Sequence, residues 1–318
     1  MTMRMLFLRV SSLFIAFTVL AMCFFTGADL AGSPYAPARG DVRMNAVILS
    51  DTHTNDKSTH DHNRMLAGLF GGVSKSKKPL DAVVIAGDLT ETATAREYLN
   101  LQTLIHRSVK NAAVLPALGN HDVRGDMSQA DYDANISRYY DFCRSFGVGA
   151  DKPYWSKTVN GYRFIVLGSE TEEKDRTHLS DEQMVWLDEE LRRSEADGKP
   201  AFIVCHQVID HTNNVDEIWR FEGSIGEQSD EVLSIIRRHT DRGLTVVFIS
   251  GHLHAAFTEY SFESPCKNLY CLNLPSALYT EEAGMGCTLE AYDNCLLIRA
   301  RNFIAGEWLP NAYNIPLR

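Results

Sequence analysis

Five apolar runs recur along the first 250 residues of the chain, and each is five to seven residues long. They occupy residues 45–50, 82–86, 113–118, 201–205 and 244–250. Runs of this length, mostly of β-branched and other apolar residues, are typical of strands that are buried on both faces. Helix-like segments lie between them. The pattern therefore predicts an α/β fold in which strands and helices alternate.

Helix-like segments fill the intervals between the apolar runs. They cover residues 61–73, 94–110, 128–146, 180–191 and 229–240. Thr94 can cap the second of these helices, and the spacing from Ser180 to Gln183 is that of a capping box at the start of the fourth. Residues 154–158 and 162–167 flank an Asn-Gly pair, which is a strong signal for a β-hairpin.

A polar cluster follows each of the five apolar runs. In chain order the clusters are Asp51-Thr52-His53, Gly87-Asp88, Gly119-Asn120-His121-Asp122, the single His206, and Gly251-His252-Leu253-His254. Each cluster alone is compatible with a turn or with a buried, hydrogen-bonded side chain. Ligands gather at the carboxyl ends of the strands of an open α/β sheet, however. Together the clusters therefore predict one polar site at one edge of the fold.

This ordered series resembles the motif series of the calcineurin-like metallophosphoesterase superfamily, and the resemblance extends over residues 44–256. It implies a four-layer α/β/β/α sandwich of two mixed β-sheets flanked by helices. We expect the carboxyl-terminal residues 257–318 to complete the sandwich. Their strand-like stretches are residues 258–262, 269–274, 287–292 and 295–303.

The resemblance also implies a centre that binds two divalent transition-metal ions. Its ligands would be Asp51, His53, Asp88, Asn120, His206, His252 and His254. The first ion would take Asp51, His53 and His254, the second would take Asn120, His206 and His252, and Asp88 would bridge the two. His121 would be the histidine beside the scissile phosphate that binds no metal, and Asp122 would be its orienting partner.

The expected reaction is hydrolysis of a small phosphoester by in-line attack of a metal-bound hydroxide. Two cations about 3.5–4 Å apart clamp the attacking and leaving oxygens, and a bound water can have its pKa lowered to about 7. Protonated His121 can protonate the leaving alkoxide, a contribution of roughly 10²–10⁴ in rate. Imidazole and carboxylate ligands without thiolate suit Mn, Fe, Zn, Co or Ni, and the sequence does not select among them.

Glu91 distinguishes the chain from one branch of the superfamily. Purple acid phosphatases carry a tyrosine ligand three residues after the bridging aspartate, and Glu91 stands at that position here. The remaining motifs fit cyclic-nucleotide phosphodiesterase-like members, and they are shared by monoesterases and diesterases. A small phosphodiester or a nucleotide is the favoured substrate. The alternative is a non-catalytic metal-binding or scaffold module, against which the complete ligand set and His121 argue.

The amino terminus predicts export. Arg4 and Arg9 flank the start of an apolar stretch, residues 10–25, and small residues follow at 26–28. This arrangement is typical of a secretory signal peptide, here over residues 1–28, and an uncleaved membrane anchor is the alternative. Residues 29–43 form an irregular lead-in to the first strand. We therefore expect a periplasmic or extracellular protein that contacts a membrane only through such an anchor.

Composition supports one catalytic domain. The chain has 318 residues, of which 45% are hydrophobic, so it can bury a substantial core. Its formal net charge is −10, and no Lys/Arg run with interleaved aromatic residues occurs. General nucleic-acid binding is therefore not expected. Nothing in the pattern specifies an oligomeric state.

Six cysteines remain once Cys23 is assigned to the signal segment. In an oxidising compartment, Cys266 with Cys271 and Cys287 with Cys295 would form disulfides local to two hairpins, although spacing does not fix connectivity. Cys205 lies within an apolar run and is expected to be a free core thiol.

A few polar residues near the motifs are secondary candidates. Arg124 could add a phosphate contact, because a guanidinium matches phosphate geometry. His211 or the pair Asn213-Asn214 could face the substrate, and the alternative is that they are exposed loop residues. His178 and His239 are expected at the surface.

Overall fold

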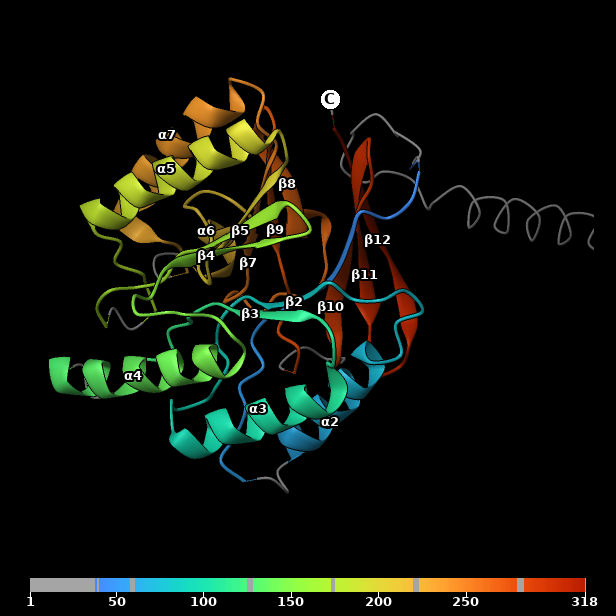
Figure 1. Cartoon of the computed structure of the whole chain (residues 1–318). Helices are drawn as coiled ribbons and strands as arrows, with labels where there is room; N and C mark the ends of the chain where they lie inside the picture. Colours follow the sequence, from blue (N-terminus) through green and yellow to red (C-terminus); the bar gives the residue numbers. More distant parts are fainter. Residues whose placement is uncertain are drawn as a thin grey trace, which may run out of the picture.

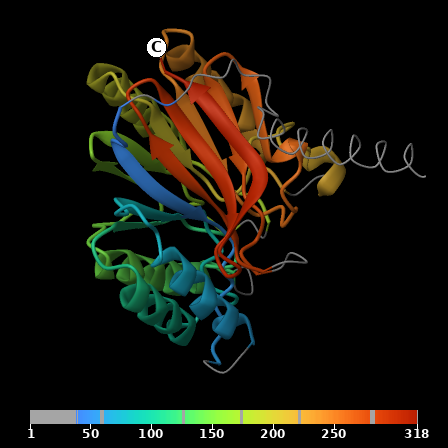
Figure 2. The ribbon, with the colours of Figure 1, turned by 90° about the vertical axis from the view of Figure 1, so that its right-hand side faces the viewer.

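Two six-stranded mixed sheets pack face to face in the computed structural model (Figures 1 and 2). It describes residues 38, 40–57, 61–124, 128–172, 175–219, 223–278 and 283–317. The strand order is β12-β11-β10-β1-β2-β3 in one sheet and β4-β5-β6-β7-β9-β8 in the other. The predicted signal segment and most of the lead-in lie outside the described residues.

The first sheet joins amino-terminal strands to carboxyl-terminal ones. Its members are β1 (Met44–Leu49), β2 (Ala82–Ile85), β3 (Ala113–Pro116), β10 (Met285–Ala291), β11 (Cys295–Asn302) and β12 (Glu307–Pro316). The second sheet contains β4 (Trp155–Val159), β5 (Tyr162–Val166), β6 (Ala201–Val204), β7 (Val246–Ser250), β8 (Phe262–Cys266) and β9 (Leu269–Asn273). Val47, Phe164 and Ile298 belong to one buried apolar cluster, so the main core lies between the sheets.

Helices flank the two sheets on their outer sides, so the predicted four-layer α/β/β/α sandwich is confirmed (Figure 1). On one side lie α2 (Asp61–Val73), α3 (Ala95–Ser108) and α4 (Gln129–Ser145). On the other lie α5 (Asp181–Asp197) and α7 (Ser229–Thr240), while the short α6 (Val215–Ile218) stands in a loop. No helix within the described ranges is long and apolar enough to span a bilayer.

Local signals in the sequence account for several boundaries. Thr94 forms a complete capping box with Glu97 at the start of α3, as its spacing allows. Ser180 accepts the N–H of Gln183 at the start of α5, but that helix continues to Asp197, six residues beyond the predicted end. Gly198 then ends it in the left-handed conformation that favours glycine. The predicted hairpin is present as β4 and β5.

The carboxyl-terminal strands differ most from the prediction. The strand β12 was not predicted, because Pro310 and two asparagines interrupt its apolar pattern; it is an edge strand, where proline is tolerated. The strand β8 begins at Phe262, since Glu259–Ser261 forms a 3₁₀ turn capped by Thr258.

The predicted disulfides are not present. All six cysteines of the described residues are free, and Cys205 is a buried free thiol as predicted. Strand register explains the correction. Cys266 lies opposite Leu269 while Cys271 lies opposite Glu263, so the two thiols are two positions apart along the hairpin. Cys287 pairs with Ala300, in the middle of the ladder between β10 and β11, whereas Cys295 begins β11.

Candidate metal centre

The first group of candidate ligands comes from the loops after β1, β2 and β7. Nε2 of His254 lies 2.9 Å from Oδ1 of Asp51 and 3.1 Å from Nε2 of His53. The same nitrogen of His53 lies 3.6 Å from Oδ2 of Asp88. One ligand atom from each of these four residues lies within 4.8 Å of the others. Strands β1 and β2 are parallel neighbours, so their carboxyl ends meet at one edge.

A second group shares Asp88 with the first. Asp88, His206 and His252 also offer three ligand atoms within 4.8 Å of one another. Nε2 of His206 lies 3.1 Å from Oδ2 of Asp88, and the rings of His206 and His252 are 4.9 Å apart at their centroids. Because Asp88 belongs to both groups, its carboxylate occupies the position expected of a bridging ligand.

Three buried polar atoms at the second group have no hydrogen-bond partner in the part of the chain that the structure describes. They are Oδ1 of Asn120, Nε2 of His252 and Nε2 of His206, whose 3.1 Å contact with Asp88 does not have the geometry of a hydrogen bond. The amide nitrogen of Asn120 donates to Oδ1 of Asp175 at 3.4 Å, which leaves the amide oxygen as the unpartnered atom. A buried polar atom without a partner costs roughly 1–3 kcal/mol. A cation that accepts these lone pairs would remove that cost, so the donor set fits a metal ion.

Hydrogen bonds on the far side of the rings select the nitrogen that remains available. Nδ1 of His206 donates to the carbonyl oxygen of Ala86 at 2.7 Å. Nδ1 of His53 lies 3.1 Å from Oε2 of Glu91. In the neutral form of both rings the proton is thereby held on Nδ1, and Nε2 carries the lone pair that a metal needs.

The backbone at this edge is unusual. Asp51, His53, Asp88, His252 and His254 all have positive φ, between 38° and 70°. Non-glycine residues rarely adopt this left-handed conformation, and such residues cluster at functional sites, where the surrounding structure holds them. Five of the seven predicted ligands are in it, which separates this edge from ordinary strand-to-loop turns.

Two motif glycines allow the loops to approach one another. A Cβ on Gly119 would lie 2.1 Å from the backbone nitrogen of Asp88, and a Cβ on Gly251 would lie 1.8 Å from Oγ of Ser50. Both distances are far below any real Cβ contact, so the spacing of the candidate ligands requires glycine at these two positions.

The charges of the two groups are coupled. Against the opposing effect of burial, the neighbouring histidines hold the pKa values of Asp51 and Asp88 below their usual range. In turn Asp51, Glu91 and Asp88 raise the pKa of His53 to about 10, and Asp88 and Asp51 raise that of His206 to about 9, again against burial. A cation that binds these imidazoles would have to displace their protons.

Comparison with known proteins decides the family. The family model for calcineurin-like phosphoesterases matches residues 44–256. The chain belongs to the calcineurin-like phosphoesterase family. Among curated proteins, a probable cyclic nucleotide phosphodiesterase from Synechococcus is 26% identical over 196 residues, which are 61% of this chain and 64% of that protein. A 3′,5′-cyclic-nucleotide phosphodiesterase from Nostoc is 27% identical over 200 residues, 63% of this chain and 64% of that protein.

The aligned part of this phosphoesterase-family chain thus covers less than two thirds of either relative's length. Among solved structures, a dimetal phosphatase from Danio rerio superposes with a TM-score of 0.58 at 14% identity. The superposition covers 87% of this chain and all of that one. At this identity the likeness shows the fold.

His121 lies beside the first group, and its ring is held by Glu91 and not by Asp122. The rings of His53 and His121 are 4.7 Å apart, and Nδ1 of His121 donates to the carbonyl oxygen of Glu91 at 2.8 Å. The N–H of His121 donates to Oδ1 of Asp88 at 2.9 Å, which fixes its loop against the shared carboxylate.

Asp122 has a different role, and this corrects the prediction. It is fully buried and accepts the N–H groups of Leu89, Thr90 and Gly119 at 2.9–3.1 Å, together with the hydroxyl of Thr90 at 2.8 Å. Its carboxylate therefore joins the loop after β2 to the loop after β3. Burial and the charge of Asp88 raise the pKa of Asp122 to about 7, in spite of these donors.

Arg124 and His211 are both held in ion pairs. Arg124 donates to Oδ1 of Asp175 at 2.8 Å, the oxygen that also accepts from Asn120. His211 is 79% exposed and paired with Asp216 at 2.9 Å.

Asn213 and His239 also differ from expectation. Asn213 is buried and donates to the carbonyl of Tyr260, so its side chain stabilises a loop. His239 is fully buried between Asp188 and Glu195, which corrects its predicted place at the surface.

Sequence reasoning missed three residues that support the site. Glu91 was noted only as the position without tyrosine, yet it holds His53 with its side chain and His121 with its backbone carbonyl. Asp175 orients Asn120, and Trp219 stacks on His252 with ring centroids 4.7 Å apart and an angle of 11°. Only Glu91 had a usable signal, since it follows Asp88 by three residues within the same motif.

Proposed function

We propose that the protein hydrolyses a small phosphodiester, with a cyclic nucleotide as the favoured substrate class, at a centre of two divalent metal ions. The observation that carries this proposal is the set of three unpartnered buried atoms, from Asn120, His206 and His252, beside a carboxylate that two ligand groups share. In a protein of this fold that binds no metal, we would expect these buried atoms to have hydrogen-bond partners, or apolar side chains to stand in their place.

One ion would be held by Asp51, His53 and His254, the other by Asn120, His206 and His252, and Asp88 would bridge them. The donor set is imidazole, carboxylate and amide, which suits Mn, Fe, Zn, Co or Ni. When bound, two such ions would supply an activated water and would neutralise charge on the phosphoryl oxygens.

The chain's own contribution to bond cleavage is assigned to His121. Because its Nδ1 donates to a carbonyl, the proton there is fixed, and Nε2 is the atom left to face the leaving group. Only the imidazolium form carries a proton on Nε2 that can be given to the departing alkoxide. The carboxylate of Asp88 accepts the backbone N–H of His121, and the carbonyl of Glu91 accepts its ring N–H. The ring is therefore oriented before substrate binds.

The preference for a diester is supported by the family relatives that are named cyclic nucleotide phosphodiesterases. The absence of tyrosine at position 91 argues against a tyrosinate-ligated ferric site of the purple acid phosphatase kind. Monoesters remain the second substrate class to test, because both reactions use the same ligand set.

The test measures hydrolysis of bis-p-nitrophenyl phosphate, p-nitrophenyl phosphate and 3′,5′-cyclic AMP by metal-stripped protein resupplied with manganese. Turnover that returns with metal and is lost in both Asp88→Ala and His121→Ala would support the two-metal hydrolase. The ratio of the diester and monoester rates would assign the substrate class.

The matched control is His106→Ala, since His106 is an exposed histidine on α3 that lies outside both ligand groups. It should retain turnover within about twofold. Two bound metals without turnover on any of the three substrates would refute the proposed activity, and it would leave a metal-binding scaffold as the better description.

A further inference from the structure

The strand edge opposite the metal centre is where the described chain begins. Residues 40–43 lead into β1, and residues 74–81 and 108–113 lead into β2 and β3, which run parallel to it. Backbone bonds join these lead-ins, since Asp81 donates to the carbonyl of Asn45 at 2.8 Å and Ala113 donates to that of Asp81 at 2.9 Å. The amino-terminal segment therefore enters the domain on the side away from the candidate ligands.

A cluster of lysines occupies this edge, although the whole chain has a net charge of −10. We define the lysine cluster as Lys75, Lys77, Lys78 and Lys110, all of which are exposed. Lys77, Lys78 and Lys110 line one cavity of about 400 Å³ between the ends of α2 and α3. Lys78 pairs with Glu290, whereas no carboxylate of the described residues pairs with the other three.

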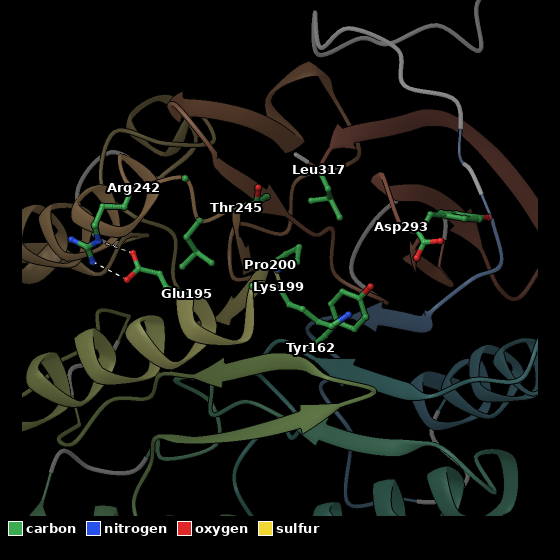
Figure 3. A pocket seen from close by; sticks show the side chains of 12 residues that line it. Tyr162, Glu195, Lys199, Pro200, Arg242, Thr245, Asp293 and Leu317 are labelled. Atoms are coloured by element: carbon green, nitrogen blue, oxygen red, sulfur yellow. Dashed lines mark hydrogen bonds and ion pairs between the residues drawn. The ribbon is translucent and has the colours of Figure 1, made fainter.

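A neighbouring cavity on the same side shows the opposite arrangement (Figure 3). Its volume is about 540 Å³, and three of its charged groups, Glu195, Arg242 and Asp293, are paired with an opposite charge. Arg242 pairs with Glu195 at 2.9 Å, and Asp293 pairs with Arg43 at 2.7 Å. Lys199 lies over the ring of Tyr162, 4.6 Å from its centroid. Arg242 thus has a carboxylate partner, whereas Lys75, Lys77 and Lys110 have none among the described residues.

We propose that residues 10–25 are retained as an uncleaved anchor, and that the lysine cluster docks on the anionic phospholipid headgroups of the membrane to which this anchor tethers the chain. A single apolar stretch of this length is shorter than the roughly 20 residues that span a bilayer. Basic residues beside a membrane anchor are attracted to anionic lipid, and each lysine near such a surface adds about 1 kcal/mol, or roughly a factor of five in partition.

Geometry permits this docking. The residues between position 25 and the first residue of β1 can span at most about 60 Å when extended, so the domain can lie on the surface to which it is tethered. With the lysine cluster against the lipid, the metal centre at the other ends of the same strands faces away from the membrane. Soluble phosphoesters would then reach it without crossing the headgroup layer.

Partition of the full chain onto two kinds of vesicle tests the docking. One kind is phosphatidylcholine alone, and the other contains about one-third phosphatidylglycerol. We expect tighter binding to the anionic vesicles, with the difference abolished by high salt. Lys77→Gln combined with Lys110→Gln should weaken binding to the anionic vesicles by about 25-fold and leave binding to phosphatidylcholine unchanged.

The matched control removes two positive charges from the other ends of the same two helices, as Arg64→Gln combined with Arg96→Gln. Both arginines are exposed, and this variant should bind anionic vesicles like the unmodified chain, within about twofold. Equal loss in both double variants would show that only net charge matters, and it would overturn the docking surface.

Hydrogen exchange on vesicles gives the orientation. Amides of residues 74–81 and 108–113 should gain protection on anionic vesicles, whereas those of residues 87–91 should not. Protection at the metal edge instead, or binding that ignores phosphatidylglycerol and both lysines, would refute the proposal and assign attachment to the apolar stretch alone.

Discussion

The metal edge and the opposite edge of the two sheets differ in whether their charged side chains are buried or exposed. At the metal edge, carboxylates and imidazoles are buried, the backbone is left-handed at five of seven predicted ligands, and three polar atoms lack hydrogen-bond partners among the described residues. At the opposite edge the lysine cluster is exposed, and Arg43 and Arg242 are paired with carboxylates at the surface. The first arrangement costs folding free energy unless a ligand binds, whereas the second costs little.

The comparison implies that stability and function are coupled at one edge only. A ligand that binds the folded state alone stabilises it in proportion to the logarithm of its concentration over its dissociation constant. We therefore expect metal binding to raise the unfolding temperature through the buried edge. Changes at the exposed edge should leave both metal content and turnover unaltered.

The largest effect is expected from Asp88→Asn. This change removes the charge that both ligand groups share, so the bound metal should fall below two ions per chain. Turnover should fall by about 10³-fold or more, since several kcal/mol of transition-state stabilisation depend on the ions. Metal analysis together with diester hydrolysis checks this. The control is Asp133→Asn on the exposed side of α4, and two retained ions in Asp88→Asn would contradict the bridging role.

His121→Gln should separate metal binding from proton transfer. The variant should keep two metal ions, because His121 belongs to neither half of the proposed ligand set. Its kcat should fall by roughly 10²–10⁴, the usual contribution of a positioned acid. The fall should be smaller for p-nitrophenyl esters than for cyclic AMP, whose alkoxide needs the proton more. An equal loss on both substrates would argue against His121 as the acid.

Glu91→Ala should weaken the site without removing a ligand. The change frees Nδ1 of His53 from its carboxylate, and loss of such a partner typically costs 10–100-fold in metal affinity or activity. Glu91→Gln keeps an acceptor at this place, so it should recover most of the metal affinity. Titration of metal-stripped protein measures both variants, and equal affinities for the two would refute a positioning role of the Glu91 side chain.

The fold was largely predictable because its strands are short, apolar and buried on both faces. The runs that precede Asp51, Asp88 and His206 correspond to β1, β2 and β6. Edge strand β12 escaped prediction because an exposed edge imposes no apolar alternation and tolerates Pro310. The disulfides were predicted from proximity in sequence, whereas thiol positions depend on strand register, which spacing alone does not reveal.

The candidate metal ligands could be predicted from the sequence, whereas most of the residues that orient them could not. Side chains such as His252 and His254 carry a recognisable spacing in the sequence. The carbonyl of Glu91 that holds His121 is a backbone atom, present at every residue, so no sequence pattern marks it. Asp122 follows His121 directly, and proximity suggested a pair, but the chain turns its carboxylate toward Leu89 and Gly119 instead.

Asp122→Asn tests that correction. An amide at this position presents an NH₂ group to backbone N–H donors, so at least one donor loses its partner at a cost of about 1–3 kcal/mol in the free energy of unfolding. Turnover of the folded, metal-loaded protein should be nearly unchanged. Urea unfolding and kcat measure the two quantities. An unchanged stability with a large loss in kcat would restore the orienting role.

The smallest effect is expected at the opposite edge, from Lys199→Met. Methionine keeps an apolar stem against Tyr162 but removes the ammonium group over its ring, a contact worth about 0.5–1 kcal/mol at an exposed site. Metal content and turnover should stay as in the unmodified chain, because nothing at this edge touches the ligand groups. Tyr162→Leu and the double variant complete a cycle that isolates the contact. A change in metal affinity with Lys199→Met would show that the two edges are coupled through the strands between them. It would contradict the inference that stability and function are coupled at the metal edge alone.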